Sequence, residues 1–290
     1  MASKLPENVK VLLLDIEGTT TSISFVHDTL FPYVRENVRM YLEENWESEQ
    51  CQTDVEALRK LTLEQITSDS SLKTVPNSAD SSKDSIIEAV VHNVHKWMDR
   101  DLKLTALKQL QGHMWKEAYE SGKVKGQLYP DVVPSLDKLL EKDIRIYIYS
   151  SGSVAAQKLL FGFSEYGDVT KKISGYFDTT SGLKVEKTSY EKIAKEIETE
   201  PENILFLTDV VRESQPAVDA GLQSFLVVRE GNAPLNDEAK EQFEVINSFE
   251  ELIDLSTENE TANGNNSGSE SNSSADGRQS PPSKRRRESD

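Results

Sequence analysis

Cysteine and long apolar runs are scarce in this chain, and basic residues are outnumbered by acidic ones. Cys51 is the only cysteine among 290 residues, so no intrachain disulfide can form and a reducing compartment is expected. No run approaches the roughly 18 apolar residues that span a bilayer, and residues 1–10 lack a signal-peptide core. Acidic residues number 50 against 33 basic ones, giving a net charge of -17. These absences exclude a membrane span and a body that binds nucleic acid through phosphate neutralisation.

Histidine is also rare, and all four histidines fall between residues 25 and 122: His27, His92, His95 and His113. His92 and His95 have a helical spacing of three, but further convincing zinc ligands are lacking nearby. We therefore expect these histidines to be packed or exposed rather than metal-bound. His27, with Phe25 and Phe31, is placed to face a ligand from this segment.

The stretch from 25 to 122 has the three- and four-residue apolar spacing of helices. Helices are predicted at His27–Trp46, Val55–Ile66, Ile86–Met98 and Thr105–Tyr119. A polar, Ser- and Asp-rich segment at Ser68–Ser85 predicts an exposed loop of low order. The stretch is therefore expected to be an all-helical insertion.

Short apolar strands alternate with helices in the rest of the chain, which predicts right-handed crossovers and a parallel sheet. The expected strands are Val11–Leu14, Ile144–Tyr149, Ile204–Leu207 and Ser224–Val228. The expected helices are 132–141, 154–161, 189–197 and 213–220. The fold class is therefore α/β, a doubly wound parallel-sheet core covered on both faces, with an inserted helical cap. We expect the core at 1–24 and 123–256 and the cap at 25–122.

Residues 257–290 are rich in Asn, Ser, Gly, Glu and Asp and poor in large apolar side chains, which predicts a disordered tail. The tail ends in a basic cluster, Lys284–Arg287, preceded by Pro281 and Pro282. Such a cluster is either a nuclear import signal read by an import receptor or part of a solvating tail. The expected localisation is cytoplasmic, with nuclear entry through this cluster as the open alternative.

Polar groups able to perform chemistry fall at the carboxyl ends of predicted strands or in loops beside them, where open α/β sheets bind ligands. They are Asp15, Glu17, Ser150, Ser151, Lys184 and Asp209. Each alone is compatible with an ordinary turn, cap or solvated side chain. Together they provide a carboxylate nucleophile, hydroxyl and amide donors, a cation and a distal carboxylate, the groups that metal-assisted phosphoryl transfer requires.

Each of these residues has a predicted role. Asp15 is the nucleophile, because a carboxylate is ionised at neutral pH without an adjacent base. Glu17 is the acid and base, which requires a raised pKa. Ser150 or Ser151 begins a helix whose free amides suit a phosphate, and Lys184 neutralises it.

The metal site is expected to consist of oxygen ligands. Asp209, Asp15 and a backbone carbonyl of Glu17 would hold magnesium, a hard cation that prefers oxygen. Glu213, one helical turn beyond Asp209, is placed to orient a metal-bound water.

The ordered motifs DIEGTT, YSSGS, GLKVEK and LFLTDV resemble those of the haloacid dehalogenase superfamily. The longer segments LLLDIEGTT, TALKQLQGHMW, IYIYSSGSVAAQKLLFG and ILFLTDV are similar to the enolase-phosphatases of methionine salvage. The resemblance covers roughly residues 11–253. Glu17 stands where most of the superfamily has aspartate, a departure that matches the enolase-phosphatase pattern.

This resemblance implies a haloacid dehalogenase-like fold and a two-step reaction. The substrate would be 2,3-diketo-5-methylthiopentyl 1-phosphate, which is enolised and then dephosphorylated to 1,2-dihydroxy-3-keto-5-methylthiopentene. By the family pattern, Asp15, Glu17 and Asp209 match the site of one Mg²⁺ per subunit. Ser150, Ser151 and Lys184 match substrate-binding positions. Glu17 is the first candidate for the enolisation base, and a cap residue is the alternative.

A dehalogenase is disfavoured, because Ser150, Ser151, Lys184 and Asp209 would form a metal and phosphate site that such chemistry does not need. Two other functions compete with this interpretation. One is a related phosphatase that acts on another small phosphomonoester without enolisation. The other is a catalytically silent scaffold that acts through the tail, against which the intact set of polar groups argues. Net acidity and the absence of heptad repeats favour a monomer.

Overall fold

The computed structural model describes residues 4–77 and 81–253, which belong to one compact unit. The basic cluster and the tail predicted at 257–290 lie outside the described residues. Within the described part of the chain, no helix is long and apolar enough to cross a membrane.

Six parallel strands form one sheet in the order β3-β2-β1-β4-β5-β6. The strands are β1 (Val11–Leu14), β2 (Arg145–Tyr149), β3 (Gly175–Phe177), β4 (Ile204–Thr208), β5 (Gln223–Val227) and β6 (Glu244–Ile246). The parallel sheet confirms the predicted fold class. Strand β1 lies at the centre, paired with β2 on one side and β4 on the other, so the loop after β1 leaves from the middle of the sheet.

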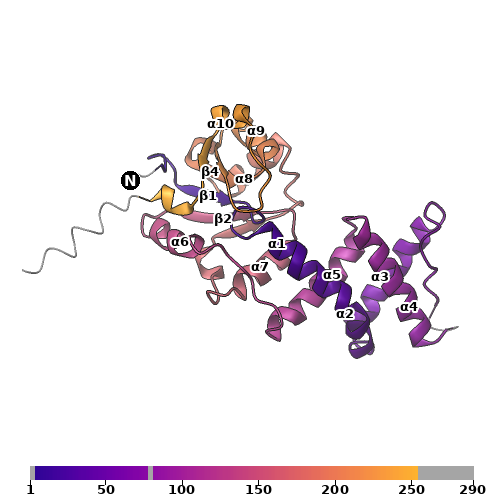
Figure 1. Cartoon of the computed structure of the whole chain (residues 1–290). Coiled ribbons are helices and arrows are strands. Elements are labelled where there is room, and N and C mark those ends of the chain that lie inside the picture. The colour runs from indigo at the N-terminus through magenta and orange to yellow at the C-terminus, as the bar shows by residue number, and fades with distance from the viewer. Residues whose placement is uncertain (1–3, 78–80, 254–290) are drawn as a thin grey trace, which may run out of the picture. The chain divides into compact units, whose positions relative to one another are not determined.

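Helices cover both faces of the sheet, as Figure 1 shows. They are α6 (Val132–Leu140), α7 (Val154–Gly162), α8 (Lys187–Glu196), α9 (Val211–Asp219) and α10 (Asp237–Gln242). Leu12 and Leu14 point to the face covered by α6 and α7, whereas Val11 and Leu13 point to the face covered by α8 and α9. Because side chains alternate along a strand, the wholly apolar run of β1 is buried on both faces.

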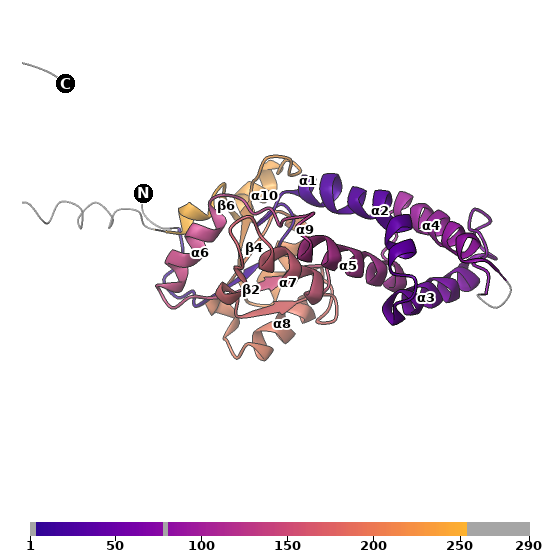
Figure 2. The ribbon, with the colours of Figure 1, turned by 90° about the horizontal axis from the view of Figure 1, so that it is seen from below.

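The segment between β1 and β2 is helical, as predicted. Before α6, it comprises α1 (Ile23–Phe25), a π-helical turn at Val26–Leu30, α2 (Phe31–Glu44), α3 (Glu49–Gln65), α4 (Lys83–Asp99) and α5 (Thr105–Glu120). Helices α2 to α5 have their own apolar cluster, in which Val34, Leu58, Val90 and Leu110 are fully buried. Figure 2 shows α5 running between the helices around the sheet and α3, in agreement with its contacts to both α7 and α3. The division into core and cap domains at 24/25 and 122/123 stays our proposal.

Two expectations for this segment differ from the structure. Helix α3 begins six residues before the predicted start at Val55, because Ser48 caps it by accepting a hydrogen bond from the Cys51 amide. The segment predicted as an exposed loop buries Leu72 and Val75. Its backbone at Lys73 is held by the side chain of Asn93, which lies on α4.

Candidate active site

The carboxylate of Asp15 lies at the carboxyl end of β1 and is almost fully buried. The Asp15 amide continues the sheet by donating to the Leu207 carbonyl at 2.9 Å. Oδ1 of Asp15 accepts from the Ile16 amide at 2.6 Å, and Oδ2 accepts from the Thr208 hydroxyl at 3.3 Å. The central strand and its neighbour therefore hold this carboxylate in place.

Lys184 forms the charge partner of Asp15. Its ammonium group contacts Oδ1 of Asp15 and lies 3.2 Å from Oε2 of Glu213, and its side chain is only 10% exposed. Lys184 follows β3, whereas Glu213 lies on α9, so three separate segments meet here. Burial acts to lower the pKa of Lys184, but the charges of Asp15 and Glu213 outweigh it and raise that pKa.

Glu213 lies between Thr208 and Lys184, and its role in orienting a metal-bound water stays a prediction. Its Oε2 accepts from the Thr208 hydroxyl at 3.0 Å and pairs with Lys184. Thr208 thus donates toward both Asp15 and Glu213 from the last position of β4. The sequence analysis ended this strand at Leu207 and missed Thr208.

Asp209 follows β4 and lies against the loop after β1. A Cβ added to Gly18 would come 2.5 Å from Oδ2 of Asp209, so the two residues are in close contact. Gly18 has a φ of +70°, which glycine adopts without strain. Burial, followed by the charge of Asp15, raises the pKa of Asp209 to about 7. Two carboxylates thus share a poorly solvated place at the sheet edge.

Glu17 points its side chain away from the sheet into a cavity of about 390 Å³ that also has helices α2 and α5 in its walls. Glu17 is exposed where it lines this cavity, and the atoms of the cavity walls crowd around its carboxyl group. The resulting desolvation, followed by the charge of Asp15, raises the pKa of Glu17, while Lys103, Lys184 and His27 act against the rise. The raised pKa is what proton transfer near neutral pH requires.

The loop after β2 brings Ser150 and Ser151 to the same cavity. The sequence analysis expected one of these serines to begin helix α7, but Ser153 is its N-cap. The Ser153 hydroxyl accepts from the Ala156 amide at 3.3 Å, and Oδ2 of Asp178 accepts from the Val154 amide at 3.1 Å. Two of the first amides of α7 are therefore used within the protein, and Ser150 and Ser151 precede the helix.

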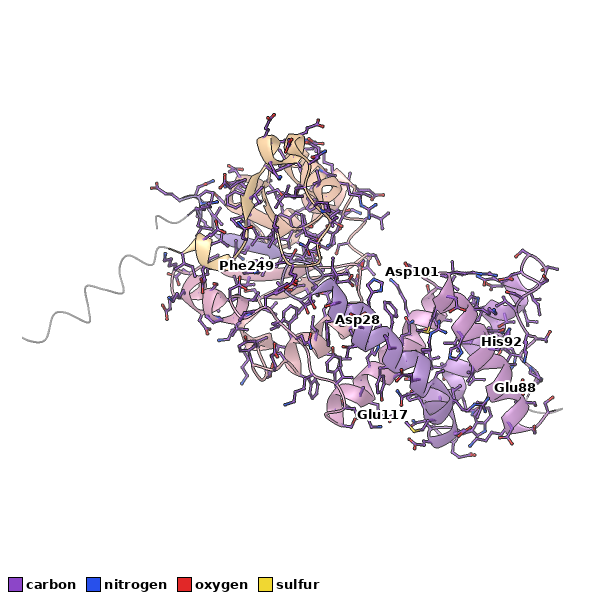
Figure 3. The ribbon with its side chains drawn as sticks, viewed as in Figure 1. Asp28, Glu88, His92, Asp101, Glu117 and Phe249 are labelled. Atoms are coloured by element: carbon purple, nitrogen blue, oxygen red, sulfur yellow. The ribbon has the colours of Figure 1, made fainter. Side chains whose placement is uncertain are left out.

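His27, Phe25 and Phe31 all line this cavity, as the sequence analysis anticipated for that part of the chain. The other histidines have partners within the helical segment. His92 donates to the Ser71 carbonyl at 2.8 Å and lies away from the sheet in Figure 3. His95 donates to the Arg35 carbonyl at 3.0 Å, and His113 lies 2.8 Å from Asp54.

Asn232 and Arg229, which the sequence analysis missed, hold the loop after β1. The Asn232 amide donates to the Gly18 carbonyl at 2.9 Å, and the Arg229 guanidinium donates to the Thr19 carbonyl at 3.3 Å. Both residues follow β5 at the same sheet edge. The rule that polar residues after parallel strands meet at one edge was the signal that could have found them.

Among residues 4–77 and 81–253, no three acidic, histidine or cysteine side chains converge on one point as a side-chain metal cluster would. Asp15 and Asp209 are nevertheless close enough to influence each other, while the Glu17 side chain faces the cavity. Two carboxylates with water or carbonyl oxygens suit a magnesium site, because Mg²⁺ uses few protein ligands and keeps several waters.

Comparison with known proteins identifies the family. A model of the haloacid dehalogenase-like hydrolases matches residues 9–221. An "Enolase-phosphatase E1" of Branchiostoma floridae is 53% identical, with 86% of this chain and 85% of the relative aligned. The protein of that name from Danio rerio is 49% identical, covering 87% of this chain and 97% of the relative.

A solved structure agrees with these relatives. The crystal structure of the UTR4 protein of Saccharomyces cerevisiae is 33% identical and superimposes with a TM-score of 0.66, covering 83% of this chain and 99% of that protein. The matched residues 9–221 include Asp15, Glu17, Lys184 and Asp209. This chain therefore belongs to the haloacid dehalogenase-like hydrolases and, within them, to the enolase-phosphatases.

Proposed function

We propose that this protein enolises 2,3-diketo-5-methylthiopentyl 1-phosphate and then hydrolyses it, through an aspartyl-phosphate on Asp15, to 1,2-dihydroxy-3-keto-5-methylthiopentene and phosphate. This is the acireductone-forming step of methionine salvage. The observation that carries the proposal is the placement of Asp15 beside Lys184, with Glu17 reaching into the adjoining cavity.

Enolisation requires a base near C1 of the substrate, the carbon that bears the phosphate ester. Glu17 takes the C1 proton and the C1–C2 double bond forms, while a water molecule gives a proton to the C2 oxygen, which becomes a hydroxyl. Because Glu17 is two residues from Asp15 and faces the cavity, a phosphate next to Asp15 brings C1 toward Glu17. The raised pKa of Glu17 makes its carboxylate a stronger base than a glutamate with an ordinary pKa.

Phosphoryl transfer follows at the same place. A carboxylate oxygen of Asp15 bonds to phosphorus while the P–O bond to C1 breaks, and protonated Glu17 supplies the proton that the leaving oxygen takes up. Glu17 then accepts a proton from the water that attacks the aspartyl-phosphate, which releases phosphate and restores Asp15, and Glu17 returns this proton to solvent before the next cycle. Lys184, Ser150 and Ser151 bind the phosphoryl oxygens through charge and hydrogen bonds.

Enolase-phosphatases and their superfamily are generally magnesium-dependent, and the acidic pair at this sheet edge fits one Mg²⁺ per subunit. The Asp15 and Asp209 carboxylates and the Glu17 backbone carbonyl would hold the ion. When bound, it supplies positive charge that stabilises the transferring phosphoryl group. The raised pKa of Asp209 fits this assignment, because two neighbouring carboxylates repel each other in the absence of a cation.

The test follows enol absorbance and phosphate release in parallel on the diketo phosphate, with magnesium and with chelator. The wild type is expected to form the enol before phosphate appears. Asp15→Asn, which keeps the shape of the side chain, is expected to lose phosphate release, and Glu17→Gln is expected to lose both steps. Phosphate release without an enol signal would instead indicate a phosphatase for another phosphomonoester. Near-normal turnover by Glu17→Gln would remove its assigned role.

We also propose that the protein is a monomer in the cytoplasm whose basic cluster, Lys284–Arg287, binds an import receptor and allows nuclear entry. The net charge of -17 supports a monomer, because like-charged copies repel one another. Replacing Lys284–Arg287 with alanine in a fluorescently tagged protein is expected to reduce its nuclear fraction. An unchanged distribution would contradict the import signal.

A further inference from the structure

The cavity that Glu17 lines has two chemically different parts. Glu17, Ser150 and Ser151 lie at the part beside the sheet edge. Much of the remaining wall is apolar and includes Phe25, Leu30, Phe31, Leu107, Trp115 and Leu160. Trp115 is held in place there, because its indole N–H donates to the Leu30 carbonyl at 3.0 Å and its ring packs edge-on against Phe31.

Gln111 interrupts the apolar wall. It lies on α5, is 4% exposed and lines the cavity. Within the described parts of the chain, its side-chain carboxamide has no hydrogen-bond partner. Two other buried amides differ: Gln157 donates to the Gly152 and Phe177 carbonyls, and Asn93 bonds to Lys73 and Thr62.

The Gln111 carboxamide is not among the buried polar atoms cut off from solvent, so a ligand group that enters the cavity can take the place of the water that reaches it. A carboxamide has both donors and an acceptor, carries no charge and does not titrate. It therefore suits a neutral polar group of a substrate rather than its phosphate.

We propose that the Gln111 carboxamide binds the 2,3-dicarbonyl group of the substrate and is a specificity-determining residue of the enzyme. This inference rests on the proposed function, which places the phosphate beside Asp15. The two carbonyls follow C1 along the substrate, and both only accept hydrogen bonds, so the Gln111 NH₂ donates to them. After enolisation the C2 hydroxyl can donate in turn to the Gln111 carbonyl oxygen.

The apolar wall fits the remainder of the same molecule. Beyond its two carbonyls the substrate has two methylene groups and a methylthio group, which hydrogen-bond weakly or not at all. Leu107 and Trp115 lie four residues before and after Gln111 on α5, hence on the same face of the helix, and all three line the cavity. Helix α5 thus places the Gln111 amide between Leu107 and Trp115, with Lys108 also lining the cavity, and these two apolar side chains suit the thioether end of the substrate.

The experiment compares Gln111→Leu with Gln109→Leu, which makes the same chemical change at an exposed position of α5. Each variant is assayed on the diketo phosphate, and 5-(methylthio)pentyl phosphate, which lacks both carbonyls, serves as a competitive inhibitor. Gln111→Leu is expected to lower kcat/KM for the diketo phosphate by about 10- to 100-fold. Its inhibition constant for the saturated phosphate is expected to stay within about twofold of wild type. Gln109→Leu is expected to change neither.

Gln111→Glu provides a second variant that keeps the size and polarity of the side chain. Its carboxylate accepts but does not donate, so the expected loss on the diketo phosphate is at least as large as for leucine. If Gln111→Leu weakens binding of the diketo phosphate and of the saturated phosphate equally, Gln111 only supports the cap. If neither kcat/KM nor the inhibition constant changes, Gln111 does not contact the substrate. Either result overturns the inference. If the wild type itself fails to turn over the diketo phosphate, the proposed function fails. A failure of the Gln111 inference alone would instead leave wild-type turnover intact.

Discussion

Nζ of Lys184 lies 3.2 Å from Oε2 of Glu213, and both side chains are buried beside the carboxylate of Asp15. A charged lysine between two carboxylates keeps a buried cluster closer to neutrality. Lys184 therefore contributes both to folding stability and to the proposed reaction. The same cation balances the buried carboxylates and is proposed to bind the phosphate.

Replacing Lys184 with methionine is expected to lower the free energy of unfolding by about 3–5 kcal/mol, because it leaves Asp15 and Glu213 buried without their cation. Phosphate release is expected to fall at least about 100-fold, since a charge that stabilises the phosphoryl group is lost. Urea unfolding in chelator and a phosphate-release assay measure the two effects. Lys187→Met is the matched control, because Lys187 is exposed and pairs only with Glu191 on the surface. A stable, active Lys184→Met protein would contradict both assignments.

Gly18→Ala is expected to disturb Asp209, because the added Cβ would lie 2.5 Å from its Oδ2. Gly122→Ala is the control: its φ of +74° resembles the +70° of Gly18, but nothing lies within 4 Å of its added Cβ. Both changes are expected to cost about 1 kcal/mol of stability through backbone strain. Only Gly18→Ala is expected to weaken magnesium binding, measured calorimetrically, and activity. Equal magnesium affinity in both variants would show that Asp209 does not bind the ion.

Arg229 is expected to stabilise the loop that follows β1. It forms a two-point ion pair with Asp131, at 2.9 and 2.8 Å, and donates to the Thr19 carbonyl. Arg229→Met leaves Asp131 buried without its cation, so the unfolding free energy is expected to fall by about 3 kcal/mol. Arg212→Met, at an exposed position on α9, is expected to change it by less than about 0.5 kcal/mol. Thermal unfolding compares the two, and similar midpoints would contradict the role of Arg229.

The lowered pKa of Asp178 is expected to make the free energy of unfolding depend on pH. Burial acts to raise its pKa, but hydrogen bonds from Thr180 and the Val154 amide outweigh it, so the pKa of Asp178 lies below its ordinary value of 3.8. A lowered pKa in the folded state means that the stabilisation is present above pH 3.8 and is lost as the pH falls through the folded pKa. The difference in unfolding free energy between wild type and Asp178→Asn is therefore expected to be largest from pH 5 to 7 and to shrink toward pH 3. Urea unfolding across this range checks it, and a constant difference would contradict the assignment.

Local patterns predicted the regular elements that are long or strongly apolar. The expected strand Val11–Leu14 coincides with β1, and the helix expected at Thr105–Tyr119 differs from α5 by one residue. In contrast, β3 and β6 were missed, because three-residue strands carry too little periodicity to stand out. The buried Leu72 and Val75 were also missed, because their neighbours are polar and the burial comes from packing against the helical segment.

The sequence by itself determined that an acidic pair follows a buried strand and that serines, a lysine and an aspartate follow later in the chain. It thereby specified the fold class and the candidate residues of the active site. Only the tertiary structure decided that Lys184 lies between Asp15 and Glu213, that Arg229 and Asn232 hold the Gly18–Thr19 loop, and that Gln111 faces the cavity. The physical reason is that apolar periodicity reports which face of an element is buried. Which polar groups meet depends on how elements far apart in the sequence pack against one another.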